Sequence, residues 1–233
     1  MIGLLKYFAG LAFLILVSCS APNNNPYNLD LINTLDSYQE TISQDSMKKF
    51  VDLEDYIPGI VLDIRYATKN NFTGEQIYRQ PKAFVRLPVA MALLKVQQEL
   101  NKEGLGLKIY DAYRPYAATL KFYDVLPDTM FVAAPWHGSR HNRGCAVDVS
   151  LVDLSTGKEL EMPSAFDDFS EKAWPSNHKV SEAVRNNCDL LINTMKNHGF
   201  TVYPYEWWHY DYEGWEEYKL VDLSFEELDR KNN

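Results

Sequence analysis

Helix-forming and strand-forming stretches are mixed along this chain without the regular strand–helix–strand repeat that builds a parallel sheet. Three stretches carry apolar residues at helical spacing: 88–103, 116–126 and 181–198. Four stretches carry alternating or β-forming residues: 59–68, 107–113, 145–154 and 200–212. The first helix is expected to begin at Pro88 and to end just before Gly104, since proline is favoured in the first turn of a helix and glycine just past its end. The order predicts an α+β fold, with a largely antiparallel sheet flanked by helices.

The chain is long enough for one domain and too short for two of comfortable size. It has 233 residues, 46% of them hydrophobic, so a substantial core can form. Its 32 acidic and 23 basic side chains give a formal net charge of -9. Because Lys and Arg are not concentrated into a phosphate-binding face, no nucleic-acid partner is expected. The oligomeric state stays open.

The first residues have the layout of an export signal. One lysine precedes an apolar run from Phe8 to Val17, which is too short to span a bilayer as a mature helix. The ending Leu-Val-Ser-Cys resembles the lipobox of bacterial lipoproteins, in which the cysteine, here Cys19, is lipidated and becomes the N-terminus. An ordinary cleavage near Cys19 and an uncleaved anchor are the alternatives.

These signals divide the chain into three expected parts. A lipoprotein signal peptide occupies 1–18, a tether occupies 19–45, and the folded domain occupies 46–233. The segment SAPNNNPYN is rich in Asn, Pro and Ser, which is typical of a tether. The protein is therefore expected to be exported and held at a membrane through its lipid, in the periplasm or at the cell surface.

The segment SRHNRGCAVDVS, residues 139–150, carries two side chains that could bind a metal ion. His141 stands seven positions before Asp148. Alternate residues of the strand that follows point to opposite faces. The apolar set suits a core, and the set that includes Asp148 suits the floor of a cleft.

A further metal ligand has to come from another of the five histidines. His209 is the candidate, because EWWHYD places Glu206 three residues before it. A catalytic zinc site takes three His or carboxylate ligands and needs a nearby base that is not a ligand. His141, Asp148 and His209 supply the ligands, and Glu206 supplies the base. Residues three apart in a regular strand face opposite sides, so Glu206 is expected in a turn or bulge, with the regular strand beginning after it.

Two motifs resemble the signatures of the zinc D,D-peptidases of cell-wall chemistry. SRHNRGCAVD matches Ser-x-His-x-x-Gly-x-Ala-x-Asp, and EWWH matches Glu-x-x-His. Within that group the chain is most similar to the D-alanyl-D-alanine dipeptidases of the VanX type. Three further segments carry this similarity: RYATKNNFTG at 65–74, YDAYRP at 110–115 and FDDF at 166–169. The resemblance covers about residues 55–220 and implies a zinc site on the cleft face of the sheet.

The resemblance implies a role for each matching residue. The family's zinc ligands, for one Zn²⁺ per chain, fall on three residues: His141, Asp148 and His209. Its general base falls on Glu206. Its transition-state arginine falls on Arg114, with Asp111 placed to hold the guanidinium. The alternative for Arg114 is a surface loop residue that simply pairs with Asp111.

Substrate contacts follow from the same resemblance. Ser139 and Asp167 match positions near the substrate termini, and Asp168 takes the place of Asp167 if the alignment is off by one. Arg140 departs from the pattern, because the best-known dipeptidases carry a second serine there, and this leaves the contacts to the substrate carboxylate open. Cys145 replaces a commoner small residue and is expected to pack rather than to bind the metal.

The expected function is zinc-dependent hydrolysis of the free dipeptide D-Ala-D-Ala to D-alanine, in cell-wall peptide turnover outside the cytoplasm. One alternative is a zinc D,D-carboxypeptidase or endopeptidase that uses the same machinery on longer wall peptides. Another is an inactive zinc-binding module that recognises wall fragments, and a third is a structural lipoprotein. Other divalent ions can also occupy a site of two histidines and one aspartate.

Overall fold

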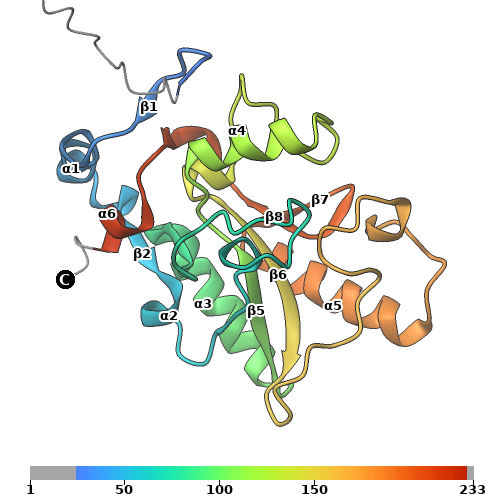
Figure 1. The fold of residues 1–233 in the computed structure, drawn as a ribbon. Helices are drawn as coiled ribbons and strands as arrows, with labels where there is room; N and C mark the ends of the chain where they lie inside the picture. The colour runs from blue at the N-terminus through green and yellow to red at the C-terminus, as the bar shows by residue number, and fades with distance from the viewer. Residues whose placement is uncertain (1–24, 230–233) are drawn as a thin grey trace, which may run out of the picture.

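The computed structural model describes residues 25–229, so the predicted signal peptide, Cys19 and residues 20–24 of the predicted tether lie outside the described part of the chain. At its centre is a five-stranded sheet (Figure 1). Its strands, in spatial order, are β3 (Val61–Leu62), β5 (Leu105–Asp111), β6 (Ala146–Asp153), β8 (Glu206–Tyr212) and β7 (Phe200–Tyr203). β3 and β5 are parallel, and the other neighbours are antiparallel. The predicted α+β fold with a largely antiparallel sheet is confirmed.

The three predicted helices are present as α3 (Leu87–Asn101), α4 (Tyr116–Val125) and α5 (Glu182–Asn197). Pro88 lies in the first turn of α3, and the Ser181 hydroxyl caps α5 by accepting from the Val184 amide at 3.2 Å. α3 packs against β5, α5 packs against β7 and β8, and the two helices contact each other. α4 lies beyond the upper ends of the central strands in Figure 1. No helix within residues 25–229 combines the length and apolar character that crossing a bilayer requires.

Two pairs of short strands lie outside the central sheet. β1 (Leu31–Ile32) runs parallel to β9 (Leu220–Val221), so a segment near the start of the described chain lies beside one near its end. β2 (Phe50–Asp52) runs antiparallel to β4 (Phe84–Arg86). The other helical segments are short: α2 (Leu53–Tyr56), α6 (Phe225–Asp229) and the 3-10 turns η1 (Ser46–Lys48), η2 (Arg65–Ala67), η3 (His141–Arg143), η4 (Glu171–Ala173) and η5 (Trp215–Glu217).

An additional helix, α1 (Leu35–Gln44), lies in the range that the sequence assigned to a tether. Leu35 and Ile42 contact the core, and Tyr38 between them is buried. The Tyr38 hydroxyl accepts a hydrogen bond from the Phe50 amide at 2.7 Å. The folded part of the chain therefore begins at or before β1, earlier than the boundary at residue 46 expected from the sequence.

β6 is buried on both faces, whereas its alternating pattern predicted a half-buried strand. All residues from Ala146 to Val152 are buried. Over the face that carries Asp148, the ring of Phe166 stacks on that of Tyr110 with 4.6 Å between their centroids. The cover comes from a loop far away in the sequence. Although β6 is buried, its residue Asp148 lines a cavity.

Candidate metal centre

Three neighbouring strands bring Asp111, Asp148 and His209 into one row across the sheet. Asp148 on β6 is the direct partner of Asp111 on β5 and of His209 on β8. Directly opposed residues on neighbouring strands carry their side chains on the same face. β5 reaches this register through an irregularity between Ile109 and Asp111. The row thus depends on strand pairing and on one local distortion of β5.

His141 approaches this row from η3, the short turn that precedes β6. Its amide donates to the Ser139 hydroxyl at 3.1 Å, and its Nδ1 donates to the carbonyl oxygen of Ala112 at 2.7 Å. A carbonyl oxygen can only accept, so Nδ1 donates here and Nε2 is the ring nitrogen that can offer a lone pair to a metal ion. This contact both orients the ring and leaves Nε2 free to bind a metal ion.

The two residues after η3 have structural roles. Gly144 has a φ of 71°, and a Cβ added there would lie 2.2 Å from the Phe50 ring, so the motif requires glycine at this position. Cys145 is buried, and burial raises the pKa of its thiol to about 12. Cys145 and Cys188 are both free and buried. Cys145 is not part of the metal cluster and packs in the core.

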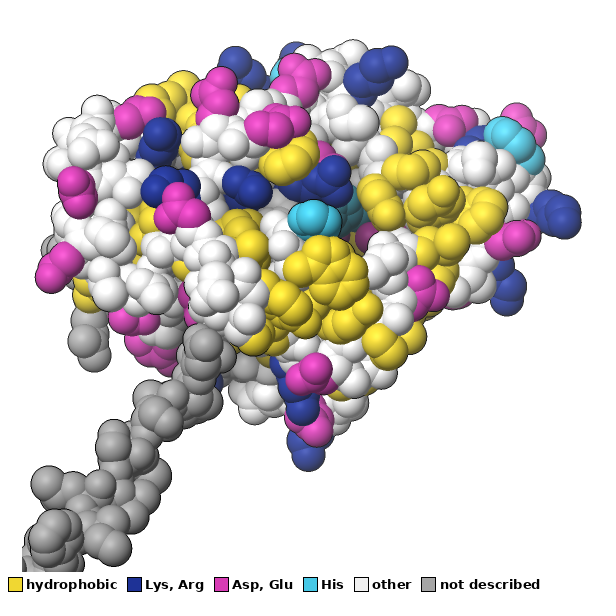
Figure 2. Space-filling model, turned by 90° about the horizontal axis from the view of Figure 1, so that it is seen from above, with side chains coloured by type: hydrophobic (Ala, Val, Ile, Leu, Met, Phe, Trp, Pro, Cys, Tyr) yellow, Lys and Arg dark blue, Asp and Glu magenta, His cyan; other side chains and the backbone are white. Residues whose placement is uncertain are grey.

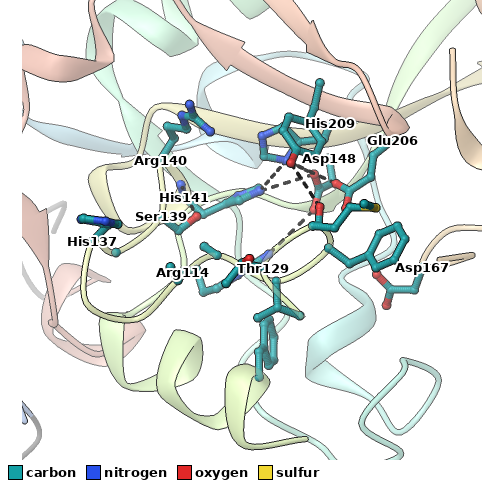
Figure 3. A pocket seen from close by; sticks show the side chains of 18 of the residues that line it. Arg114, Thr129, His137, Ser139, Arg140, His141, Asp148, Asp167, Glu206 and His209 are labelled. Carbon is teal, nitrogen blue, oxygen red and sulfur yellow. Dashed lines mark hydrogen bonds and ion pairs between the residues drawn. The ribbon is translucent and has the colours of Figure 1, made fainter. Parts of the chain in front are cut away.

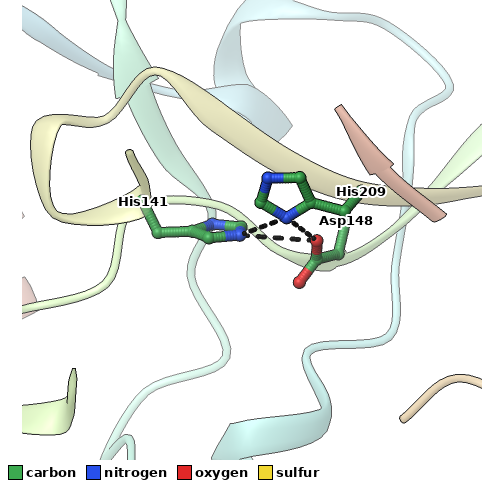
Figure 4. Close-up of side chains that lie close together, drawn as sticks. All are labelled: His141, Asp148 and His209. Carbon is green, nitrogen blue, oxygen red and sulfur yellow. Dashed lines mark hydrogen bonds and ion pairs between the residues drawn. The ribbon is translucent and has the colours of Figure 1, made fainter. Parts of the chain in front are cut away.

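The three predicted ligands place one donor atom each around a common point (Figure 4). His141 Nε2 lies 3.1 Å from His209 Nδ1 and 3.4 Å from Asp148 Oδ1. His209 Nδ1 and Asp148 Oδ1 are 3.0 Å apart. Tetrahedral zinc with bonds of about 2.0–2.2 Å holds its ligand atoms roughly 3.3 Å apart. The donor atoms therefore fit a single zinc ion.

The charges around this point favour a cation. His209 Nε2 donates to Asp211 Oδ1 at 3.0 Å, which is the kind of contact that orients a metal-binding histidine. Burial opposes a charge on His209, yet the carboxylates of Asp211 and Asp148 raise its pKa to about 10. Burial also opposes ionisation of Asp148, but His141 and His209 hold its pKa below the usual range. A divalent ion would supply the positive charge that these carboxylates favour.

Glu206 reaches the same point from the first residue of β8. Val202 pairs with Tyr210, but the next residue of β7, Tyr203, pairs with Glu206, so the intervening part of β8 bulges. The bulge lets Glu206 and His209 face the same side, with 3.9 Å between Glu206 Oε2 and His209 Nδ1. Burial raises the pKa of Glu206 to about 8. The predicted irregularity is present, and it lies within the strand rather than before it.

Arg114 is buried beside the cluster and is held by Asp111. Its Nε and Nη2 donate to Asp111 Oδ2 at 3.0 and 2.8 Å, and Nη2 lies 3.9 Å from Asp148 Oδ2. The Tyr78 hydroxyl also donates to Asp111, at 3.0 Å. The guanidinium carbon lies 4.6 Å from the centre of the Phe122 ring. These contacts fix the direction of the guanidinium, so Arg114 is not a surface loop residue.

A cavity of about 500 Å³ opens over the cluster. Figure 2 shows a hollowed face with a histidine near its centre, basic side chains on one side and hydrophobic ones on the other. Figure 3 shows side chains that line the cavity. Its walls include most of the predicted site residues: Arg114, Ser139, His141, Asp148, Asp167, Glu206 and His209. Asp111 stands behind Arg114 and does not line the cavity.

Asp167 lines the cavity, whereas its neighbour Asp168 does not. The Tyr66 hydroxyl donates to Asp167 Oδ1 at 3.0 Å, and Oδ2 is buried with no hydrogen bond of good geometry in the described part of the chain. Burial, with a further contribution from the Asp148 charge, raises the pKa of Asp167 to about 7. Asp168 instead accepts from the Ser170 hydroxyl at 2.6 Å. Of the two aspartates, Asp167 is the one placed to meet a ligand.

Two supporting residues, Asp211 and Tyr66, do not follow from the motifs. Asp211 is two positions after His209, which puts both on the same face of β8, so the strand periodicity of HYD could have identified it. Tyr66 meets Asp167 across 101 positions of sequence. No local pattern indicates that contact.

Sequence comparison with known proteins identifies the family of this chain. The family model described as D-ala-D-ala dipeptidase matches residues 46–226. A D-alanyl-D-alanine dipeptidase of Escherichia coli (strain K12) is 34% identical over 177 residues, covering 76% of this chain and 91% of that protein. One of Enterococcus faecium is 30% identical over 181 residues, covering 69% of this chain and 90% of that protein. A solved structure of the LdcB LD-carboxypeptidase has a TM-score of 0.43 and 22% identity over 78% of each chain. The chain therefore belongs to the D-ala-D-ala dipeptidase family of metallopeptidases.

Proposed function

We propose that this chain hydrolyses the free dipeptide D-Ala-D-Ala with one zinc ion held by His141, Asp148 and His209. The proposal depends above all on one observation, the convergence of five side chains on a single cavity. Three supply donor atoms at the separations of zinc ligands, and Glu206 and Arg114 lie beside them. The names of two relatives, both D-alanyl-D-alanine dipeptidases, support D-Ala-D-Ala as the proposed substrate.

A zinc ion in this site would act as a Lewis acid that activates water and polarises the scissile carbonyl. Glu206 is not one of the three donors, and its carboxylate lies 3.9 Å from one of them. The ionised form of Glu206, which a zinc ion beside it would favour, can accept a proton from the attacking water and return it to the leaving amine. Arg114 is buried and fixed by Asp111, so its charge can stabilise the negative charge that develops on the carbonyl oxygen.

The free dipeptide carries an ammonium group next to its scissile carbonyl. Asp167 lines the cavity, and its Oδ2 has no hydrogen bond of good geometry among the described residues, so the carboxylate keeps acceptor capacity for that group. An ammonium at this position would also favour the ionised form of Asp167, whose pKa burial raises to about 7. Ser139 lies near His141, and its hydroxyl can donate to a substrate oxygen while it accepts from the His141 amide.

A D,D-carboxypeptidase is the second candidate, and the size of the cavity favours it. About 500 Å³ lies within the range of pockets that hold drug-sized ligands. Two alanine residues do not need that much space, so part of a longer peptide could enter.

The place of action is part of the proposal. If Cys19 is lipidated, the enzyme acts outside the cytoplasm and recycles D-amino acids released from the wall. Membrane fractionation of wild type and Cys19→Ala, with mass determination of the mature N-terminus, tests this. A cytosolic wild-type protein with an intact N-terminus would contradict both the anchor and the role.

Three substrates test the proposed reaction: D-Ala-D-Ala, N-acetyl-D-Ala-D-Ala and a wall pentapeptide that ends in D-Ala-D-Ala. Purified protein of known zinc content should hydrolyse the free dipeptide at least about tenfold faster than the other two, because acetylation removes the ammonium that Asp167 would bind. Equal rates on the pentapeptide would replace the dipeptidase by a carboxypeptidase. Stoichiometric zinc without hydrolysis of any substrate would indicate a recognition module.

A further inference from the structure

We infer that Arg140 binds the carboxylate at the C-terminal end of the substrate and makes a free carboxylate a requirement for efficient hydrolysis. The inference rests on the proposed hydrolysis of D,D-peptides at this site. Arg140 follows Ser139, at a position where the dipeptidases that the chain resembles carry a second serine. The resemblance therefore assigns no role to an arginine here and leaves the contacts to the substrate carboxylate open.

Arg140 and Asp167 stand at opposite ends of the cavity. Both line it, and Figure 3 shows them on opposite sides of the His141, Asp148 and His209 side chains. One end therefore presents an anion and the other a cation, with the donor atoms between them. A free dipeptide is a zwitterion with its ammonium and its carboxylate on opposite sides of the scissile bond. The charges of the cavity match that substrate when the ammonium meets Asp167 and the carboxylate meets Arg140.

The Arg140 side chain is held in place but keeps hydrogen-bond donors for a ligand. Its guanidinium carbon lies 4.8 Å from the centre of the Trp215 ring, and its Nε lies 3.4 Å from Asp211 Oδ2. Among the described residues, Asp211 is the one carboxylate within 4.0 Å of this guanidinium. Because Nε makes that contact, the outer nitrogen atoms retain donors for a second carboxylate in the two-pronged geometry that arginine favours. The side chain is 40% exposed, so a ligand can reach it.

A second arginine, Arg143, also lines the cavity but is already engaged. Its guanidinium donates to the carbonyl oxygen of Tyr218 and lies 5.3 Å from the Trp215 ring centre. Arg140 is thus the freer of the two cations for an incoming anion.

Arg140 has a possible structural role that an experiment must separate from substrate binding. Asp211 contacts Arg140 through Oδ2 and His209 through Oδ1, so Arg140 could act only by steadying the metal ligand. A steadying role would change zinc affinity and kcat for every substrate alike. A carboxylate-binding role would change KM and only for substrates that carry the carboxylate.

The test compares D-Ala-D-Ala with its C-terminal amide, D-Ala-D-Ala-NH₂, in four zinc-loaded proteins: wild type, Arg140→Gln, Arg140→Lys and the matched control Arg79→Gln. Arg79 is exposed and does not line the cavity, so its variant controls for the loss of one positive charge. Wild type and Arg79→Gln should prefer the acid over the amide by at least about tenfold in kcat/KM. Arg140→Gln should lose about ten- to a hundredfold on the acid through KM, with the amide and the zinc content unchanged. The kcat/KM of Arg140→Lys on the acid should lie between those of wild type and Arg140→Gln, because lysine keeps the positive charge but lacks the two-pronged guanidinium.

The inference fails if Arg140→Gln keeps the wild-type preference for the acid, or if it loses zinc and slows on both substrates equally. If wild type hydrolyses neither compound, the proposed function fails separately. Calorimetric binding of the same two compounds to wild type and Arg140→Gln then decides the inference. Weaker binding of the acid alone by the variant supports it, and equal binding by both proteins overturns it.

Discussion

The two halves of the cavity are built in different ways. The metal half lies on the central sheet, where Asp148 and His209 are paired partners on β6 and β8 and Glu206 begins β8. Most of the other half comes from residues 129–140 and 166–169, which contain neither helix nor strand. Paired strands fix side chains to the tolerance that a metal site needs, whereas loops can change without disturbing the sheet. The metal half should therefore govern kcat and zinc content, and the loop half should govern the choice of substrate.

The largest effect is expected from Glu206→Ala. Loss of the general base should lower kcat by about two to four orders of magnitude, while zinc stays bound because Glu206 is not one of the three donors. Steady-state kinetics and metal analysis of the same preparation measure both quantities. The matched control is Glu213→Ala, since Glu213 is exposed just after β8. Normal turnover by Glu206→Ala would remove it from the mechanism.

Arg114→Lys should be the next most severe change. Lysine keeps the charge but cannot reproduce the two contacts of Arg114 to Asp111 Oδ2. We expect kcat to fall by about 10²–10³, the usual loss when one donor to a developing oxyanion is removed. An enzyme that stays fully active with lysine here would show that Arg114 has a structural role.

Asp211→Asn tests whether the residue that orients the ligand His209 matters as much as the ligands themselves. It weakens the contact that orients His209, which should cost about 10–100-fold in zinc affinity or activity. Competition with a chromophoric chelator measures the affinity. Unchanged affinity together with unchanged turnover would show that Ala112 and the strand pairing hold the ligands without Asp211.

Asp167→Asn addresses the loop half. A charge-assisted hydrogen bond to the substrate ammonium is worth roughly 1.5–3 kcal/mol, so kcat/KM for D-Ala-D-Ala should fall about ten- to a hundredfold while zinc stays bound. The neighbouring Asp168→Asn is the matched control and should behave as wild type, because Asp168 does not line the cavity. The reverse pattern would mean that Asp168 meets the ammonium.

The same carboxylate should also affect the stability of the folded protein. Burial raises the pKa of Asp167 from 3.8 to about 7. The folded protein thus holds a proton that the unfolded chain releases, and the stability from this group falls as the pH rises through that window. Asparagine does not titrate, so metal-free Asp167→Asn should gain in melting temperature relative to metal-free wild type between about pH 5 and pH 8. Each kcal/mol of unfolding free energy corresponds to roughly 2–4 °C in melting temperature for a domain of this size. A difference in melting temperature between variant and wild type that stays constant across this pH range would contradict the burial argument.

The metal half of the cavity was largely predictable from the sequence, because its chemistry is local. His141 and Asp148 lie in one motif, Glu206 and His209 lie in another, and the requirement that both members of the second motif face the metal predicted the bulge in β8. Asp211 could have been added by strand periodicity alone.

The parts that could not be predicted depend on contacts between distant segments. Tyr66 meets Asp167 across 101 positions, and Phe166 covers Tyr110 beside a strand that looked half exposed. Helix α1 was missed because its sequence LDSYQETISQ is mostly polar, and only Leu35, Tyr38 and Ile42 face the core. Such contacts depend on how the elements pack, which a local pattern does not contain.

Zinc-dependent release of D-alanine from free D-Ala-D-Ala tests the assignment most directly. We predict that purified protein hydrolyses the dipeptide, loses that activity after a chelator has removed its metal, and recovers it with about one equivalent of zinc per chain. Hydrolysis that persists in metal-free protein would contradict a zinc-dependent reaction, and the absence of hydrolysis from protein carrying one zinc per chain would contradict the proposed dipeptidase activity.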